Sequence, residues 1–264
     1  MEKTTSADGT PIAYRVIGDG PLGVVFVHGW TCTGNTWNET LDQLPKDGRR
    51  IVVPDLRGHG GSAGDDLDHS VRRYAEDIVA AADAAGLERF VTIGHSMGGK
   101  YAQYVRVIAG ERVIAHIGVA PTPSCTVSEG STEEEVEHMT SGAGYAPAWV
   151  GLLDYITKNP LPDDVKIGLA DEAATLTKEV LASSMRTFSR TDYTDELADA
   201  PSVPTLIIGG SADPFYPPTL LEERIAVEAP SARLVVVDSG HDPLHETSEE
   251  LASLIDDFLT EVSS

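Results

Sequence analysis

The sequence has 264 residues, 41% hydrophobic and 23% charged, which is ordinary for a globular chain long enough to bury a full core. Its formal net charge of −23 and pI near 4.5 argue against binding to nucleic acids or anionic membranes, because these polyanions repel an acidic protein. No stretch approaches twenty uninterrupted apolar residues and the N-terminus has no hydrophobic signal core, so we expect a cytoplasmic protein without a membrane span.

The chain contains two cysteines, Cys32 and Cys125, which are far apart in the sequence. They cannot form a zinc site by themselves, so we expect free thiols rather than a disulfide framework, and no metal or other cofactor. The oligomeric state is not set by the composition, and a homo-oligomer is compatible with it.

The first strands are predicted near the N-terminus. Residues 12–17 form a strand-like run between the turn at 8–11 and a second turn at 18–21, which predicts an opening hairpin. Residues 22–27 are nearly all apolar, as in a strand buried on both faces, and end in His28-Gly29-Trp30. A loop at the C-terminal end of a central strand is where open α/β sheets bring backbone groups to a ligand. Apolar residues at helical spacing follow from Trp37, so a helix is expected next.

Another strand, at 50–54, leads into a charged, glycine-rich segment at 55–62. The segment has no P-loop lysine and does not open directly into a helix, so we interpret it as a structural loop tied by Asp55 and Arg57 rather than a phosphate cradle. Ser70 is a predicted N-cap for a helix that runs through Ala85 and stops at Gly86.

The most informative stretch is residues 90–100, FVTIGHSMGGK. A β-branched and aromatic run ends at Gly94, and a 3.6-residue apolar period begins just after Ser96, so a strand must turn into a helix within about three residues. The turn forces Ser96 toward positive φ, and Gly94 and Gly98 let the two backbones pass without Cβ clashes. This Gly-X-Ser-X-Gly motif in a strand-turn-helix context is typical of a nucleophile elbow. A further strand is expected at 113–120.

The alternation of strands and helices stops at Pro121. Up to about residue 201 the sequence has no clear strand but several helical patterns: one from Ser131 with Glu134 as its capping-box partner, one through 149–156, and one over 174–188. We therefore expect a helical cap at 121–201, inserted into a core of residues 1–120 and 202–264. The core resumes with a strand at 204–209, a helix at 218–228, a strand at 233–238 and a last helix at 247–262.

A serine hydroxyl needs an imidazole to accept its proton and a carboxylate to orient that imidazole. Asp213 follows one late strand and His241 the next, so both are placed at the sheet edge that Ser96 occupies, in the order serine, acid, histidine. His245 is the alternative base, and Asp238 or Asp242 the alternative acid.

The remaining histidines receive other interpretations. We expect His95 to point away from the side of Ser96, and His28 to be a hydrogen-bonding strut of its loop. Surface or loop positions are expected for His59, His69, His116 and His138.

Together, the His28-Gly29-Trp30 turn, the 55–60 loop, the elbow, Asp213 and Gly240-His241 resemble the α/β-hydrolase fold superfamily. The resemblance covers the whole chain except the cap, and it implies a mostly parallel eight-stranded sheet with helices on both faces and a cap between the sixth and seventh strands. It also implies that Ser96 is the nucleophile, His241 the base and Asp213 the orienting acid. The backbone N–H groups of Trp30 and Met97 would form the oxyanion hole.

The resemblance favours hydrolysis of a small carboxylic ester or lactone through an acyl-enzyme. Serine at the elbow speaks against haloalkane dehalogenases and epoxide hydrolases, which carry aspartate there. The elbow and the Gly-Trp turn most resemble cofactor-free haloperoxidases, or perhydrolases, but Thr31 stands where those proteins commonly have proline. Perhydrolysis and carbon–carbon bond hydrolysis with the same triad remain alternatives, and so does a catalytically dead ligand receptor of the same fold.

Specificity is expected to lie in the cap and the loops beside the triad. Candidate substrate-binding residues combine apolar cap positions, the two aromatic residues that closely follow the acid, and the two cysteines: Tyr145, Trp149, Met185, Phe188, Phe215, Tyr216, Cys32 and Cys125. The apolar cap residues have the alternative role of forming the cap's own core.

Overall fold

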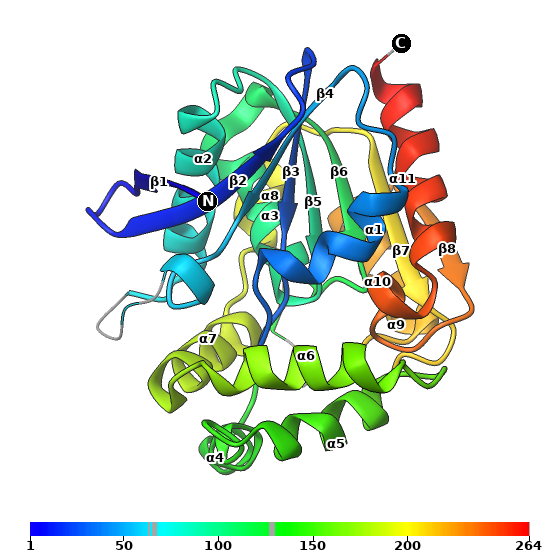
Figure 1. Ribbon diagram of the computed structural model, residues 1–264. Coiled ribbons are helices and arrows are strands. Elements are labelled where there is room, and N and C mark those ends of the chain that lie inside the picture. The colour runs from blue at the N-terminus through cyan, green and yellow to red at the C-terminus, as the bar shows by residue number, and fades with distance from the viewer. Residues whose placement is uncertain (63, 65–67, 127–129, 264) are drawn as a thin grey trace.

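The computed structural model describes residues 1–62, 64, 68–126 and 130–263 and is organised around a central sheet (Figure 1). Within these residues the sheet has eight strands in the order β1-β2-β4-β3-β5-β6-β7-β8. The β1/β2 and β2/β4 pairs are antiparallel and the other neighbours are parallel. The mostly parallel eight-stranded sheet predicted from the sequence is therefore confirmed. The strands are β1 Glu2–Thr5, β2 Pro11–Ile17, β3 Leu22–Val27, β4 Arg49–Pro54, β5 Phe90–His95, β6 Val113–Val119, β7 Thr205–Gly210 and β8 Arg233–Val237.

The opening hairpin is formed by β1 and β2, across the first of the two turns that flank residues 12–17. The other neighbour of β2 is β4, so β2 does not pair with β3. β1 was not predicted because its four residues are polar and mostly exposed, so they lack the apolar alternation that marks a strand.

Helices cover both faces of the sheet, as the alternation of strands and helices predicts. They are α1 Asn38–Gln43, α2 Val71–Ala84, α3 Met97–Ala109, α9 Pro218–Glu228, α10 Pro243–Glu246 and α11 Ser248–Ser263. Val25 and Val27 of β3 pack with α2 and α3, whereas Val24 and Phe26 pack with α1 and α11. This period-two division explains why β3 is apolar along its whole length.

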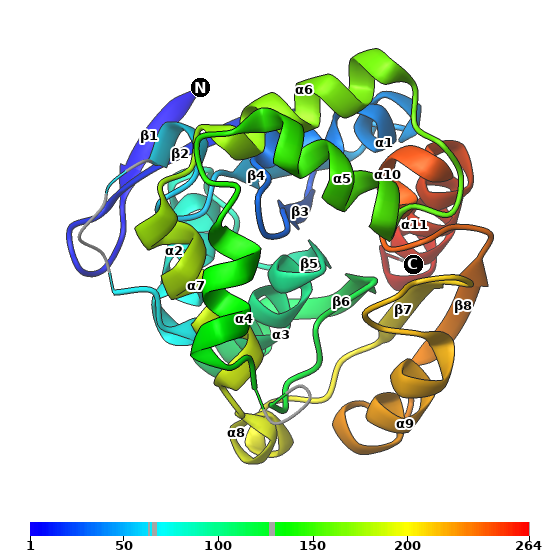
Figure 2. The ribbon, with the colours of Figure 1, turned by 90° about the horizontal axis from the view of Figure 1, so that it is seen from below.

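Among the described residues between β6 and β7 there are five helices: α4 Glu133–Thr140, α5 Ala146–Ile156, α6 Asp163–Ala174, α7 Lys178–Arg190 and α8 Thr194–Asp199. In Figure 2, α4–α7 lie around the ends of β3 and β5. α8 instead packs on α3. Its Leu197 belongs to the hydrophobic core that α2 and α3 form against the sheet, and the Tyr104 hydroxyl of α3 donates to Glu196 at 2.6 Å.

The helices expected from Ser131 and over 174–188 are present as α4 and α7, but the cap of the first and the start of the second differ from the prediction. The capping box of α4 uses Thr132 and Glu135, one residue later than predicted. Ser131 with Glu134 and Thr132 with Glu135 both have the three-residue spacing of a capping box, so the sequence pattern fits either pair. Residues 174–188 do not form one helix: α6 ends at Ala174, and α7 starts anew with Thr177 as its N-cap. Among the helices of the described residues, none is long and apolar enough to cross a membrane.

Candidate active site

Ser96 occupies a sharp turn between β5 and α3, with φ 51° and ψ −123°. A Cβ on Gly94 would lie 2.3 Å from the carbonyl oxygen of Gly98, and a Cβ on Gly98 would lie 2.2 Å from that of His28. Only glycine fits at both positions, so the sequence forces the strand and helix close together and raises the Ser96 hydroxyl above the C-terminal edge of the sheet.

The two predicted partners of Ser96 reach it in the structure. The Ser96 hydroxyl lies 2.9 Å from Nε2 of His241, and His241 Nδ1 lies 2.8 Å from Oδ2 of Asp213. The other carboxylate oxygen of Asp213 accepts from the N–H groups of Phe215 (2.8 Å) and Tyr216 (3.0 Å). Burial raises the pKa of Asp213, but His241 and these hydrogen bonds lower it by more, so the pKa lies below its usual value and the carboxylate stays charged.

The alternative partners make other contacts. His245 Nδ1 is paired with Asp242, at 2.8 Å from Oδ2, and neither makes a hydrogen bond to Ser96. Asp238 is exposed and forms an ion pair with Lys158.

His95 corrects one expectation, since it does not point away from the site. Its ring centroid lies 5.2 Å from that of His241, and its Nε2–H donates to the backbone carbonyl of His241 at 2.9 Å. Burial lowers the pKa of His95 to about 4, so the ring is neutral. His95 therefore supports the loop that carries His241.

The loop after β3 approaches the elbow from the other side. A Cβ on Gly29 would lie 3.4 Å from the Cβ of Ser96, which places the backbone of Trp30 beside the hydroxyl. Met97 is the first residue of α3, where a backbone N–H has no acceptor within the helix. The predicted role of the Trp30 and Met97 N–H groups as oxyanion donors stays a prediction. Thr31 has a φ of 65°, an unusual value for a residue other than glycine.

His28 holds this loop as predicted: its Nε2 accepts from the Leu56 N–H and its Nδ1 donates to the Gly29 carbonyl, both at 2.9 Å. The 55–62 loop is also structural. Asp55 accepts from the N–H groups of Gly34 and Gly61, at 2.8 Å each.

Arg57 makes two bonds of 2.7 Å to the buried carboxylate of Asp77. The expectation of surface or loop positions holds for His59 and His69, which lie in loops, but is wrong for His116, which lies within β6. His59, His69 and His116 are buried, and burial lowers the pKa of His59 and of His116 to about 3. His138 is exposed.

A cavity of about 800 Å³ opens above Ser96, between the sheet edge and helices α4–α7. It is lined by six of the eight predicted substrate-binding residues: Cys32, Trp149, Met185, Phe188, Phe215 and Tyr216. Tyr145 and Cys125 are not among the lining residues, which corrects those two predictions. Tyr145 is the exposed N-cap of α5, and the backbone of Cys125 is held by Lys100 behind the cavity wall.

Sequence reasoning missed several cap residues that line the cavity, including Met139, Leu152, Leu153, Ile156 and Leu169. Three of them share the helical spacing of Trp149, and this spacing was the available signal. It identifies an apolar face of α5 but does not say whether that face meets the cap's core or a cavity.

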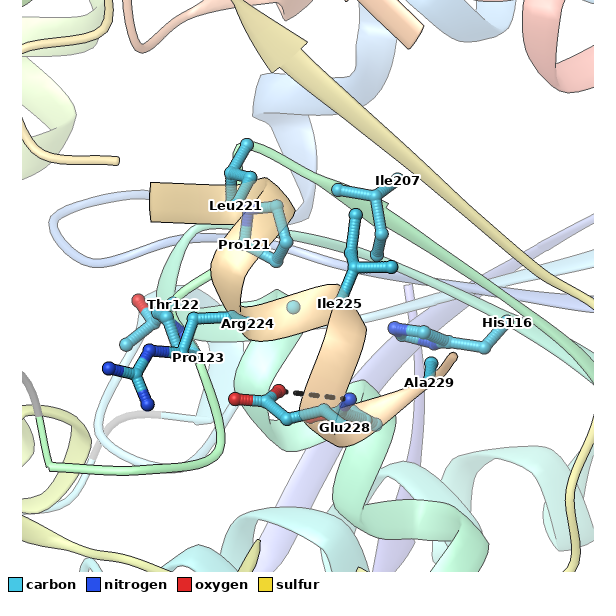
Figure 3. Close-up of a pocket in the computed structure, with 12 residues that line it drawn as sticks. His116, Pro121, Thr122, Pro123, Ile207, Leu221, Arg224, Ile225, Glu228 and Ala229 are labelled. Atoms are coloured by element: carbon cyan, nitrogen blue, oxygen red, sulfur yellow. Dashed lines mark hydrogen bonds between the residues drawn. The ribbon is translucent and has the colours of Figure 1, made fainter. Parts of the chain in front are cut away.

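A second cavity, of about 30 Å³, lies between α9 and the sheet. Figure 3 shows Leu221 and Ile225 of α9 near Pro121 and Ile207. The space suits about one water molecule and is too small for a substrate.

Both cysteines are free. Burial raises the pKa of the Cys32 thiol to about 12, so Cys32 is a protonated wall residue rather than a nucleophile. In the part of the chain that the structure describes, no group of three or more histidine, cysteine or acidic residues could hold a metal ion.

A family model described as "Alpha/beta hydrolase family" matches residues 24–254. A non-heme haloperoxidase of Rhodococcus erythropolis is 31% identical over 255 residues, which cover 89% of this chain and 90% of the relative. A non-heme chloroperoxidase of Streptomyces lividans is 32% identical over 237 residues, covering 82% and 84%. A bifunctional esterase/perhydrolase of Acinetobacter calcoaceticus is 26% identical, covering 89% and 90%. Among solved structures, an esterase of Exiguobacterium antarcticum has a TM-score of 0.88 at 23% identity and 98% coverage of both chains, a likeness of fold.

Proposed function

Because the chain belongs to the alpha/beta hydrolase family, we propose that it is a serine hydrolase that cleaves a small carboxylic ester or lactone through an acyl-enzyme. The observation that carries this proposal is the line of hydrogen bonds from Ser96 through His241 to Asp213, at 2.9 and 2.8 Å. Such a line supplies the nucleophile, its base and the carboxylate that orients the base.

In the proposed reaction, His241 Nε2 accepts the Ser96 proton while the hydroxyl oxygen attacks the carbonyl carbon of the substrate. Asp213 holds the proton on Nδ1, so that Nε2 presents a lone pair to the hydroxyl, and it stabilises the imidazolium that forms. The N–H groups of Trp30 and Met97 donate to the oxyanion, and the N-terminus of α3 adds a favourable dipole.

Collapse of the tetrahedral intermediate expels the alcohol, which takes the proton from His241, and leaves the acyl group on Ser96. Water then attacks the acyl-enzyme with the same base, and the carboxylic acid leaves. Each half of the reaction returns His241 to its neutral state, so no external acid, base or cofactor is required.

We propose that the segment between β6 and β7 acts as the cap that sets substrate choice. The support is that residues 130–189 supply most of the cavity wall, while Ser96 and His241 lie on core loops. Because α8 packs on α3, the functional part of the 121–201 segment would end with α7.

Ser96→Ala tests the function directly. It should lower kcat for p-nitrophenyl butyrate by about 10³-fold or more, and it should abolish labelling by a fluorophosphonate. Ser211→Ala, which removes an exposed hydroxyl beside Lys158, is the matched control and should keep full activity. Undiminished turnover in Ser96→Ala would overturn the assignment, and a wild type without turnover or labelling would favour a ligand receptor.

Perhydrolysis is a second candidate because the relatives named above include haloperoxidases and an esterase/perhydrolase. Here hydrogen peroxide would replace water as the attacking group on the acyl-enzyme and release a peracid. Monochlorodimedone bromination in acetate, peroxide and bromide measures peracid formation, because the peracid oxidises bromide to the brominating species, and Ser96→Ala is the blank. Because Thr31 stands in place of the common proline, we expect hydrolysis to exceed perhydrolysis.

A further inference from the structure

The cavity above Ser96 offers large apolar walls to a substrate. Its volume of about 800 Å³ is that of a site for a whole small molecule, and an acetyl group would leave most of it empty. Cap residues such as Met139, Leu153 and Leu169 form the wall opposite the sheet, and Trp149 and Phe188 add aromatic surface.

The described lining of this space holds carboxylates but no lysine or arginine, and its histidines are His95, His138 and His241. The carboxylates are those of Glu134, Glu135 and Asp242. Burial raises the pKa of Asp242, but its neighbours His245, His95 and His241 together lower it by more, so this carboxylate is charged at neutral pH. The buried ring of His95, with a pKa of about 4, adds no positive charge.

The cations of the cap are already occupied. Residues 121–201 contain five basic and fifteen acidic side chains, and each basic one is paired with a carboxylate. The pairs are Lys158 with Asp238, Lys166 with Asp154, Lys178 with Glu137, and both Arg186 and Arg190 with Glu133. The nearby amine of Lys100 donates to the backbone carbonyls of Cys125 and Thr191, at 3.0 and 2.7 Å.

We propose that the substrate is an uncharged ester or lactone with a bulky apolar group, and that substrates carrying a free carboxylate on the acyl chain are rejected. The inference rests on the proposed hydrolysis at Ser96. A carboxylate that enters this cavity loses its hydration and finds no lysine or arginine among the described lining residues to replace it. The acidic side chains around the cavity add repulsion, which acts across a low-dielectric space.

The test compares p-nitrophenyl hexanoate, mono-p-nitrophenyl glutarate and its methyl-capped diester at pH 7.5. We expect kcat/KM for the hexanoate to exceed that for the glutarate by about 100-fold or more, and the methyl cap to restore most of the loss. Equal rates for hexanoate and glutarate would overturn the inference, and so would a diester as poor as the glutarate. Absence of Ser96-dependent hexanoate hydrolysis would instead refute the proposed function.

A charge reversal at the cavity wall distinguishes the effect of charges beside the cavity from the effect of the protein's net charge. Glu134→Lys places a cation at the wall and should narrow the hexanoate-to-glutarate ratio by about five-fold or more. Glu179→Lys makes the same change of net charge at an exposed position of α7 outside the cavity lining, and it should leave the ratio unchanged. Equal effects of the two variants would show that the whole-protein field, and not the cavity, rejects anions.

A different set of contacts points to Glu172, on α6, as a positioning residue. Its carboxylate accepts from the Thr33 hydroxyl at 2.5 Å, from the Thr33 N–H at 3.3 Å and from the Asn35 amide at 3.0 Å. These residues follow Trp30 and the left-handed Thr31 in the loop beside Ser96. We infer that Glu172 holds the Trp30 N–H in place for the proposed oxyanion.

Glu172→Ala should lower kcat for p-nitrophenyl hexanoate by about 10-fold or more with a small change in KM, because the oxyanion contact acts mainly in the transition state. The affinity for a trifluoromethyl ketone, which forms an oxyanion on Ser96, should fall in proportion to kcat. Glu172→Gln keeps one acceptor for Thr33 and should recover part of the loss, and Asp171→Ala is the exposed neighbouring control. A lower melting temperature with unchanged kcat would reduce Glu172 to a structural role and overturn the inference. If Ser96→Ala hydrolysed the ester as fast as the wild type, the underlying function would be refuted instead.

Discussion

Replacement of Asp213 by asparagine is the sharpest test of the triad, because the structure dictates how the new amide must lie. Oδ1 of Asp213 accepts two backbone N–H groups, from Phe215 and Tyr216. An amide NH₂ at that position would face two donors, so the asparagine must keep its oxygen there. The NH₂ then points at Nδ1 of His241, where Oδ2 now lies at 2.8 Å.

A donor at that place reverses the tautomer of His241. Nδ1 must accept from the amide, so the ring proton moves to Nε2, the atom that lies 2.9 Å from the Ser96 hydroxyl. The ring then has no lone pair for the serine proton, and the imidazolium loses the carboxylate that stabilises it. In triads of this type the change costs about 10⁴-fold in kcat, or roughly 5.5 kcal/mol.

The assay is kcat/KM for p-nitrophenyl butyrate at pH 7.5, with circular dichroism melting to confirm that the variant is folded. Asp238→Asn is the matched control, because this aspartate follows β8, close to His241 in sequence, but is exposed and paired with Lys158. We expect it to keep activity within about two-fold of the wild type. A folded Asp213→Asn enzyme within ten-fold of the wild type would refute this role for Asp213.

Three further predictions follow from local geometry. Thr31→Pro cannot keep a φ of 65° and should lower kcat/KM by about 100-fold as the loop rebuilds, whereas Thr31→Gly should keep activity; equal kinetics of the two variants would contradict this. Asp77→Ala leaves the Arg57 guanidinium buried without its bidentate partner and should cost about 3–5 kcal/mol in urea unfolding, and a loss below about 1 kcal/mol would contradict it. Burial lowers the pKa of His245, but Asp242 raises it by more, to a value above 6.5. The ion pair of His245 with Asp242 therefore stabilises the fold below pH 6.5, and this stabilisation is lost as the pH rises through the pKa of His245 in the folded protein. The wild type should thus exceed His245→Asn in unfolding free energy by less at about pH 9 than at about pH 6.

The elbow and the triad could be predicted because their geometry follows from local rules. Glycines two residues before and after a serine, between a strand and a helix, indicate that the two backbones pass too closely for a Cβ. The structure shows the clashes that Gly94 and Gly98 avoid. Asp213 and His241 were found because parallel strands end at the same edge of the sheet, so residues just after two late strands must meet there.

The surroundings of the site could not be predicted in the same way, since burial of polar groups depends on distant neighbours. His116 reads as a surface residue by type, yet it lies within β6 beside Thr92, whose hydroxyl is 3.0 Å from Nδ1. The cap shows the same limit. The helical spacing of Trp149 and its neighbours predicts α5, but the direction of its apolar face is set by α6 and the cavity.

The cap is joined to both loops that carry the reacting groups, which constrains how substrate choice and chemistry can vary. The Trp30 indole donates to the Leu181 carbonyl of α7 at 3.1 Å, and the His241 N–H donates to the Ile156 carbonyl at the end of α5 at 2.7 Å. A rigid opening of the cap would therefore break hydrogen bonds at the base and beside the oxyanion donors at once. In the proposed function the cap is therefore a fixed wall of the cavity rather than a free lid. The helices that would select the substrate also hold the loops of Trp30 and His241. A substitution that reshapes the cavity wall would therefore also displace these two loops.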